Sequence, residues 1–239
     1  MLPTRELAIQ VDEVLSDLGK SFGIKTALLI GGVSSYPQKI ALRKKPQIII
    51  ATPGRLIDHI QRKNCNLSDI NLVVLDEADR MLDIGFMPQI REIANHHNLK
   101  IIEDGSHSIG STYNHGGKEH RCGDGIHADL STYSFHPVKH ITTGEGGMVL
   151  CDDDELHERC KSLKNLCFQG KKRFVHEELG YNFRMSNIQA ALGVAQLERI
   201  EEFVEKKRYI GKMYTDLLSD IDAIQLPLEK TDYSNNIYW

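Results

Sequence analysis

The chain has 239 residues, of which 41% are hydrophobic and 26% charged, so its composition fits one large α/β domain or two small ones. No apolar run approaches the roughly 20 residues that span a bilayer, and the first residues lack a signal-peptide pattern, so we expect a cytoplasmic protein without membrane contact. Residues 1–92 hold 12 basic and 11 acidic side chains and residues 93–239 hold 17 and 22, so neither part has the positive excess of a protein that binds nucleic acid by bulk charge.

The cysteines predict reduced thiols. They are odd in number and contain no C-x-x-C pair: Cys65, Cys122, Cys151, Cys160 and Cys167. A disulfide framework or a zinc knuckle is therefore not expected.

Up to about residue 92, helix and strand patterns alternate. Residues 7–18 carry apolar side chains at helical spacing. Short apolar runs at 27–30, 47–51 and 72–75 are typical of strands. This alternation predicts the α/β class, with mostly parallel sheets covered by helices.

Two carboxylates, Asp76 and Glu77, directly follow the apolar run 71–75. They are therefore expected at the carboxyl end of a strand, where open α/β sheets bind ligands. Carboxylate oxygens suit the magnesium ion of a bound nucleotide, and a second carboxylate can orient the attacking water. For these two residues alone, a polar helix start is the simpler interpretation.

Three motifs in order favour the nucleotide site: Pro-Thr-Arg-Glu-Leu-Ala at 3–8, Ala-Thr-Pro-Gly-Arg at 51–55 and Val-Leu-Asp-Glu-Ala-Asp-Arg-Met-Leu-Asp at 74–83. Over about residues 2–90 they resemble the first, RecA-like core domain of DEAD-box RNA helicases. The resemblance implies Mg-ATP binding at the third motif. It also implies contacts to the RNA backbone, through side chains and helix-start N–H groups, from Thr4, Arg5, Thr52, Gly54 and Arg55.

The loop with which such helicases cradle the nucleotide phosphates is missing from the sequence. It would end in Gly-Lys-Ser or Gly-Lys-Thr. The one Gly-Lys-Ser, residues 19–21, has Val14 where the first glycine is needed, so we predict a helix C-terminus there. The Ser-Ala-Thr motif and the second core domain with its arginine fingers are also missing. Mg-ATP binding is therefore not expected, and RNA binding should be weak or absent.

From residue 93 the alternation of strand and helix patterns resumes. Strands are predicted at 99–103, 130–135 and 148–151, followed by a long helix that begins with a capping-box pattern at Ser186 and Gln189. An apolar stripe with a 3.6-residue period predicts a packed helix face: Leu197, Ile200, Phe203, Val204, Ile210, Tyr214 and Leu217.

Lys139 lies between an apolar run and a glycine-rich turn, within residues 134–147. A lysine that attacks an aldehyde needs partial burial, which favours the neutral amine, and glycines let the backbone approach a bulky cofactor. Asp104 ends the run 99–103, where a carboxylate can keep a pyridine nitrogen protonated. Lys139 alone would be interpreted as a solvated surface lysine, but the pair favours pyridoxal phosphate.

Residues 106–108 (Ser-His-Ser) and 180–193 (Gly-Tyr-Asn-Phe-Arg-Met-Ser-Asn-Ile-Gln-Ala-Ala-Leu-Gly) accompany this pair. Together they make residues 93–239 resemble the sugar-nucleotide aminotransferases, which are fold-type I pyridoxal-phosphate enzymes. The resemblance implies a sugar nucleotide and an amino donor as reactants. Residues 103–160 are most similar to pseudaminic-type aminotransferases, whereas 165–168 and 235–239 are more similar to GDP-perosamine synthases. The resemblance therefore does not identify the substrate sugar.

The same resemblance assigns roles to single residues. Lys139 would attach the cofactor and shuttle a proton, Asp104 would pair with the pyridine nitrogen, and His107 would pack beside the ring. Ser134 would hold the cofactor phosphate. Asn182 would reach the phosphate site of a neighbouring subunit, which implies a homodimer.

The sequence thus predicts a join of two partial domains, 1–92 and 93–239, with the change between Gln89 and Asn98. Helicase-like residues occupy the place of the N-terminal region that gives such transferases further phosphate contacts and a stacking ring. Their strands are expected to extend the transferase sheet. Three hypotheses follow: a sugar aminotransferase with pyridoxal phosphate weakly bound or lost, a helicase fragment, and a non-catalytic chimera.

A zinc site is a competing interpretation of the histidine-rich segment. His107, His115, His120, Cys122 and His127 lie within 21 residues. Their spacings match no standard ligand pair, so no metal is expected and a solvated polar loop is favoured.

Overall fold

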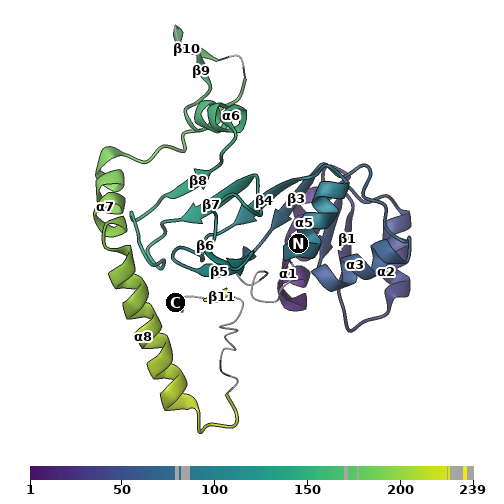
Figure 1. The fold of residues 1–239 in the computed structure, drawn as a ribbon. Coiled ribbons are helices and arrows are strands. Elements are labelled where there is room, and N and C mark those ends of the chain that lie inside the picture. Colours follow the sequence, from purple (N-terminus) through teal and green to yellow (C-terminus); the bar gives the residue numbers. More distant parts are fainter. Residues whose placement is uncertain are drawn as a thin grey trace. The chain divides into compact units, whose positions relative to one another are not determined.

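A computed structural model describes residues 1–78, 81, 87–169, 172–176, 178–224, 226 and 234–235 of the chain (Figure 1). The chain divides into two compact units, Met1–Asp104 and Gly105–Trp239.

The first part of unit 1 alternates helix and strand: α1 (Arg5–Lys20), β1 (Thr26–Leu29), α2 (Ser35–Arg43), β2 (Ile48–Ala51) and α3 (Pro53–Gln61). Strands β1 and β2 are parallel, with Thr26 opposite Ile48 and Leu29 opposite Ala51. Helix α1 ends at Lys20 with Ser21 as its C-cap, which confirms the predicted helix C-terminus at residues 19–21.

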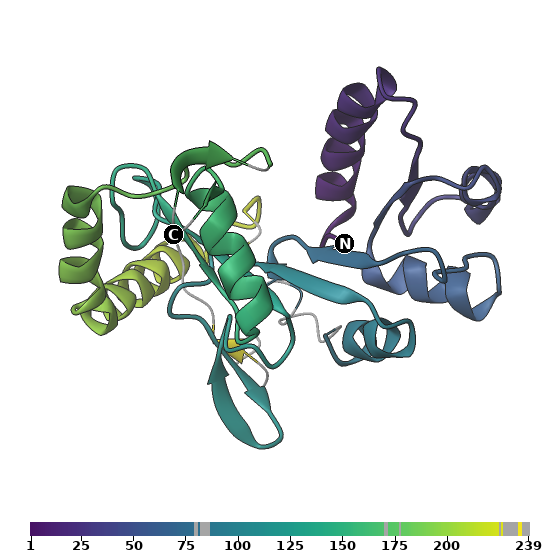
Figure 2. The ribbon, with the colours of Figure 1, turned by 90° about the horizontal axis from the view of Figure 1, so that it is seen from above.

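Helices cover both faces of this parallel pair. One apolar cluster joins Ala8 of α1 to Ile30 and Ile50, and a second joins Leu56 of α3 to Leu29 and Ala51. Successive strand residues point to opposite faces, so the two clusters lie on opposite sides of the pair. Figure 2 shows α1, in purple, on one side of the strands.

The second part of unit 1 contains β3 (Leu72–Leu75), α5 (Met87–His96) and β4 (Lys100–Asp104). Strands β3 and β4 are parallel, with Leu72 opposite Lys100 and Leu75 opposite Glu103. The helicase-like strand β3 thus pairs with a strand that follows the predicted join. The extension of the transferase sheet by the helicase-like strands stays a prediction.

The described residues of unit 2 form short strands and helices: β5 (Thr112–His115), β6 (Lys118–Arg121), β7 (Leu130–Ser134), β8 (Gly147–Leu150), α6 (Asp154–Lys164), β9 (Phe168–Gln169), β10 (Lys172–His176), α7 (Asn187–Leu197), α8 (Ile200–Leu218) and β11 (Ser234–Asn235). Four strand pairs of this unit are antiparallel: β7–β8, β5–β6, β9–β10 and β5–β11. The α/β class is confirmed. The expected parallel pairing is found in unit 1, whereas these pairs of unit 2 run the other way.

The helix predicted after Ser186 is two helices that bend at Glu198 and Arg199, as Figure 1 shows for α7 and α8. The capping box of Ser186 and Gln189 is confirmed. The predicted packed face differs from the structure: Val204 is buried, but Tyr214 is 64% and Leu217 is 72% exposed. A helix stripe shows which side chains can share a face, and only a packing partner buries them.

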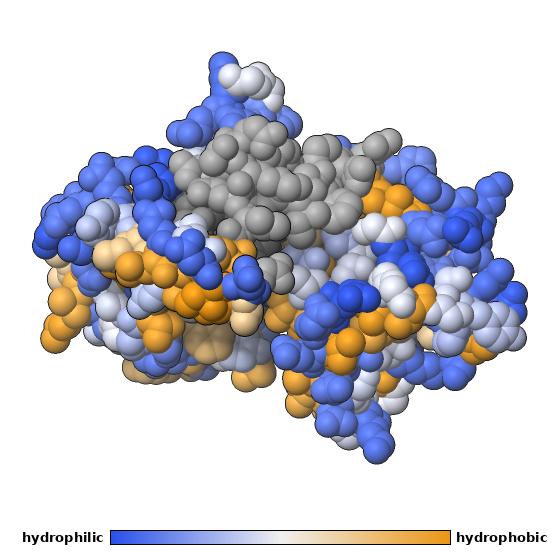
Figure 3. Space-filling view, turned by 90° about the horizontal axis from the view of Figure 1, so that it is seen from below, coloured by the Kyte–Doolittle hydropathy of each residue, from blue (hydrophilic) through white to orange (hydrophobic). Residues whose placement is uncertain are grey.

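Apolar side chains also reach the surface elsewhere. Patches of them, in orange, are visible on the face of the molecule drawn in Figure 3. Nevertheless, none of the described helices is long and apolar enough to cross a membrane.

Candidate functional site

Lys139 lies in the loop that follows β7. Phe135 is buried, the next three residues are exposed, and Lys139 itself is half-buried. The Lys139 amide donates to the carbonyl of His136 at 3.0 Å, which makes a tight turn. Further along, the amide of Thr143 donates to the carbonyl of Phe135, also at 3.0 Å, so the loop folds back onto the end of β7.

The side chain of Lys139 contacts the imidazole of His107. Its Nζ lies 2.8 Å from Nε2 of His107, within hydrogen-bond distance. Lys139 donates when the ring proton is on Nδ1. The turn that carries His107 is fixed to β7, because the amide of Gly105 donates to the carbonyl of Thr132 at 2.9 Å. The structure therefore places an amine and an imidazole, both predicted as site residues, in direct contact within unit 2.

Helix α7 holds the glycine-rich loop after Lys139. Gln196 Nε2 donates to the carbonyl of Thr142 at 2.6 Å, and its Oε1 accepts the amide of Thr142 at 3.0 Å. Seven residues earlier, Gln189 Nε2 donates to the carbonyl of Glu145 at 2.9 Å. The sequence interpretation missed this role of the two glutamines. Their spacing, which puts them on one helix face, was the only signal.

For the other predicted cofactor residues, the structure shows their positions in the fold. Ser134 ends β7, and its Oγ accepts the amide of His136 at 3.3 Å. Asp104 ends β4 in unit 1. Asn182 is exposed and forms an isolated bridge with Asn165. The pairing of Asp104 with Lys139 across the cofactor, the phosphate contact of Ser134 and the role of Asn182 in a second subunit stay predictions.

The donor set of unit 2 suits pyridoxal phosphate chemically. An amine that can react with an aldehyde lies against an imidazole, and a hydroxyl stands at the neighbouring strand end. A side chain at Gly105 would place its Cβ 2.7 Å from Ser108 Oγ and 3.0 Å from the Thr132 carbonyl oxygen. Only glycine fits this turn, which brings His107 to the lysine.

The helicase-like carboxylates Asp76 and Glu77 directly follow β3, as predicted. Asp76 donates its amide to the carbonyl of Met1 at 3.0 Å. Burial, and then the nearby carboxylates of Asp104 and Glu77, raise the pKa of the Asp76 carboxyl. Of the same motif, Asp79, Arg80, Leu82 and Asp83 lie outside the described residues.

We expect Asp76→Asn to stabilise unit 1 at neutral pH. The raised folded-state pKa means that the ionised carboxylate costs stability once the pH rises above its ordinary range, and asparagine carries no such charge. The two proteins should therefore have the same urea midpoint near pH 3. As the pH rises toward 7, the midpoint of the variant should become higher than that of the unchanged chain. An equal or lower midpoint for the variant at pH 7 would contradict the assignment.

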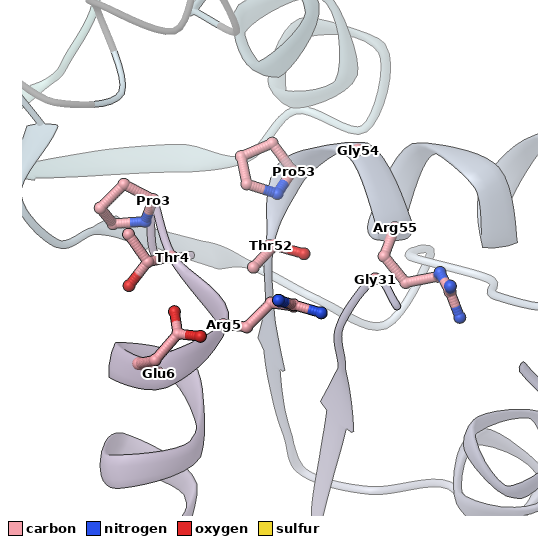
Figure 4. Close-up of a pocket in the computed structure, with 9 residues that line it drawn as sticks. All are labelled: Pro3, Thr4, Arg5, Glu6, Gly31, Thr52, Pro53, Gly54 and Arg55. Carbon is pink, nitrogen blue, oxygen red and sulfur yellow. The ribbon is translucent and has the colours of Figure 1, made fainter. Parts of the chain in front are cut away.

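All five residues predicted to bind the RNA backbone line one pocket, which has a volume of about 480 Å³ (Figure 4). Helices α1 and α3 both begin there, behind Thr4 and Thr52 respectively. Helix starts carry partial positive charge and unpaired N–H groups, which attract anions. Thr4 caps α1 by accepting the amide of Leu7, whereas the side chain of Thr52 makes no such cap bond.

Two guanidinium groups stand beside the loop that follows β1. Arg55 donates from both terminal nitrogens to the carbonyl of Val33, at 3.2 and 3.3 Å. Arg5 lies so close to Gly32 that a Cβ there would be 2.0 Å from its Nη1. Gly32 also has a φ of +74°, so it is needed for both the turn and the approach of Arg5. Phosphate binding by this pocket stays a prediction.

The histidine-rich segment forms a ring cluster on a hairpin. Gly116 and Gly117, with φ of 60° and 77°, turn β5 into β6. His120 stacks on Tyr113 at 5.6 Å, and His115 meets His127 edge-on at 5.0 Å. Within the described ranges, no group of three or more His, Cys, Asp or Glu side chains is arranged to hold a metal ion. None of the five cysteines, all of which lie within the described residues, forms a disulfide.

Comparison with known protein families adds to the evidence from the lysine site. The profile of the DegT/DnrJ/EryC1/StrS aminotransferase family matches residues 83–239, which is more than half of the chain. The chain belongs to this family. The DEAD/DEAH box helicase profile matches residues 1–109, so both resemblances predicted from the sequence are confirmed, and the two matches share residues 83–109. The shared stretch contains β4 and Asp104.

Relatives of both kinds are found. The chain is 40% identical over 153 residues to GDP-perosamine synthase of Escherichia coli O157:H7, covering 64% of this chain and 40% of that protein. It is 53% identical over 96 residues to DEAD-box ATP-dependent RNA helicase 20 of Arabidopsis thaliana, covering 40% of this chain and 19% of the helicase.

A solved structure is also similar: PseC of Helicobacter pylori, an aminotransferase involved in the biosynthesis of pseudoaminic acid. The TM-score is 0.53 at 26% identity, and the match covers 77% of this chain and 43% of PseC. The chain thus spans less than half the length of each of these three relatives.

Proposed function

We propose that the aminotransferase part binds pyridoxal phosphate at Lys139 and acts on a keto sugar nucleotide, with little or no turnover in this chain. The contact between Lys139 and His107 is the observation that carries the proposal. Sugar-nucleotide chemistry is what the family membership supports, and the named relatives include a GDP-perosamine synthase. We expect this activity in the cytoplasm.

When bound, pyridoxal phosphate supplies an aldehyde to the lysine and an electron-accepting pyridine ring. The chain supplies the rest. Lys139 provides the attacking amine, and His107 can take or return a proton at Nε2, which lies 2.8 Å from the amine. Asp104 would keep the ring nitrogen protonated, and the Ser134 hydroxyl would bind the phosphate.

Low turnover is proposed because the helicase-like residues take the place of further phosphate contacts and of a stacking ring. A homodimer is proposed as well, because Asn182 is exposed and would complete the site of a second subunit. The test is reduction with borohydride in the presence of pyridoxal phosphate, followed by peptide mapping, with amino sugar formation measured in parallel from a keto sugar nucleotide and glutamate.

A second candidate function is weak binding of an RNA backbone by the helicase-like part. The pocket at the starts of α1 and α3, with Arg5 and Arg55 beside it, favours this candidate. A few phosphate contacts give weak, salt-dependent affinity without sequence preference.

We expect no ATP hydrolysis, with or without RNA. Residues 19–21, the one Gly-Lys-Ser, end helix α1 and so do not form a loop that cradles phosphates. Phosphate release from ATP should equal that of the Glu77→Gln protein, in which the carboxylate that would orient water is lost. RNA-stimulated hydrolysis that disappears in Glu77→Gln would show that the helicase part is still a nucleotide hydrolase.

A further inference from the structure

The loop between β1 and α2, residues 30–34, borders the pocket at the starts of α1 and α3. Gly31 of this loop lines the pocket (Figure 4). Helix α3 holds the loop, because Arg55 donates from both terminal nitrogens to the carbonyl of Val33. His59 follows four residues later in the same helix, so its side chain lies on the same face of α3 as that of Arg55.

His59 reaches the same loop through a second side chain. Its Nε2 lies 3.2 Å from Oε1 of Gln38, a residue of α2. Gln38 Nε2 in turn donates to the carbonyl of Ile30 at 3.0 Å and to that of Ser34 at 3.4 Å. The His59 and Gln38 side chains are 0% and 6% exposed. This buried relay therefore holds both ends of the loop, while Arg55 holds its middle.

The contacts of Gln38 fix the tautomer of His59. An amide side chain donates from its nitrogen and accepts at its oxygen, so Gln38 Oε1 accepts while Nε2 donates to the two carbonyls. The Nε2 of His59 must then carry the ring proton, which leaves a lone pair on Nδ1. Among the described residues, the buried Nδ1 of His59 has no hydrogen-bond partner. A proton added at Nδ1 would therefore have no acceptor.

The surroundings of the ring also oppose its protonation. Four charged side chains act on it: Arg55, Asp58, Arg62 and Lys39. Burial, and then the positive charge of Arg55, lower the pKa of His59, and Asp58 offsets only part of this effect. The nearby Cys65 thiol stays neutral, because burial raises its pKa. The ring is thus neutral in the folded chain, and the folded state loses stability as the pH falls below about 6.5, the ordinary histidine value.

We infer that His59 is a pH-sensitive positioning residue of the phosphate pocket: the neutral ring holds the pocket loop in place, and uptake of a proton at Nδ1 releases it. The inference rests on the second candidate function, binding of an RNA backbone. A buried cation without an acceptor is costly, so the contact between α3 and the loop opens until water reaches the ring. The start of α3 and the guanidinium of Arg55 then no longer face the same anion as the loop does.

The test is binding of a short rhodamine-labelled oligouridine to the full chain, measured by fluorescence anisotropy at pH 7.5 and pH 5.5. Protonation of exposed histidines adds positive charge, which by itself raises affinity for RNA. We expect the opposite for the unchanged chain, a fall of about three- to tenfold, because one proton taken up below about pH 6.5 costs up to tenfold per pH unit.

Two variants separate His59 from the other histidines. His59→Gln keeps a side-chain donor for Gln38 but cannot titrate, so its affinity should stay level or rise on acidification. His96→Gln removes an exposed histidine of α5 in the same unit and should keep the loss at pH 5.5. Equal pH profiles for the unchanged chain and His59→Gln would overturn the inference.

NMR provides a readout that needs no RNA. Nitrogen spectra should show a proton on Nε2 of His59 and none on Nδ1 at pH 7.5. The amide signals of Gly31 and Gly32 should shift between pH 7.5 and 5.5 in the unchanged chain and stay in place in His59→Gln. If this pattern holds but neither protein binds RNA, the second candidate function fails and the hold of His59 on the loop stands. A proton on Nδ1 at pH 7.5, or equal shifts in both proteins, would contradict the role of His59 whether or not RNA binds.

Discussion

Borohydride reduction in the presence of pyridoxal phosphate is expected to fix the label on Lys139, and the Lys139→Ala protein is expected to lose it. The amine of Lys139 is half-buried and 2.8 Å from an imidazole that can accept its proton, whereas most lysines of the chain lie exposed in water. Peptide mass spectrometry of the reduced protein measures the labelled fraction at each lysine.

Affinity for the cofactor should be poor even so. The helicase-like residues are expected to replace phosphate contacts and a stacking ring, each worth on the order of 1 kcal/mol, and about every 1.4 kcal/mol lost weakens binding tenfold. We therefore expect a weak visible absorbance band that grows with cofactor concentration, and no amino sugar product.

Two variants control the labelling. Lys118→Ala removes an exposed lysine on β6 and should leave the label in place. His107→Ala keeps the amine but removes its neighbour, so the label should form more slowly and with a different pH profile. Equal labelling of Lys139→Ala would mean nonspecific reaction of surface lysines, and the aminotransferase resemblance would then describe ancestry alone.

Local patterns predicted the elements of the fold well. The alternation of apolar runs predicted β1, β2, β3, β4 and β7 to within a residue or two at each end. The Ser186 and Gln189 spacing predicted the start of α7, because both capping partners lie within one turn. Signals of this kind are contained in a few neighbouring residues.

Features that depend on distant segments were not predicted. The Met1 carbonyl bonds to Asp76, 75 positions further along the chain, and no local pattern encodes such a pair.

Two local features were also missed. The β5–β6 hairpin was predicted as a polar loop, although Gly116-Gly117 between two short runs is a recognised hairpin turn. The bend at Glu198 and Arg199 interrupts an unbroken apolar period, so periodicity gave no warning of it.

The site was predictable to the extent that motifs carry it. Lys139 and His107 were both predicted from the family resemblance, and the structure brings them together. The five residues at the starts of α1 and α3 were likewise predicted as a group. Gln189 and Gln196 were missed, because hydrogen bonds from a helix to the backbone of a remote loop leave no sequence motif.

The Ile101→Ala protein is expected to lose about 2–4 kcal/mol of unfolding free energy from unit 1, the usual range for emptying a fully buried isoleucine position. Ile101 is 0% exposed and lies on β4 opposite Val73 of β3. This pair of strands joins the helicase-like residues to the segment after the predicted change of family. If the join were a linker between separate domains, the Ile101→Ala substitution would leave the helicase-like part as stable as before.

Urea unfolding, followed by exchange protection of β1 and β2 amides, measures the loss in the helicase-like residues themselves. Val14→Ala is the matched control, since Val14 is 57% exposed on α1 and should change stability by less than about 0.5 kcal/mol.

Native trypsin digestion adds a second readout at Arg91, which lies in α5 between the buried residues Ile90 and Ala94. Cleavage there should be slow in the unchanged chain and faster in Ile101→Ala. Rapid cleavage at Arg91 in the unchanged chain, with two stable fragments, would show that the two families meet at a flexible boundary and that the β3–β4 pairing does not hold them together.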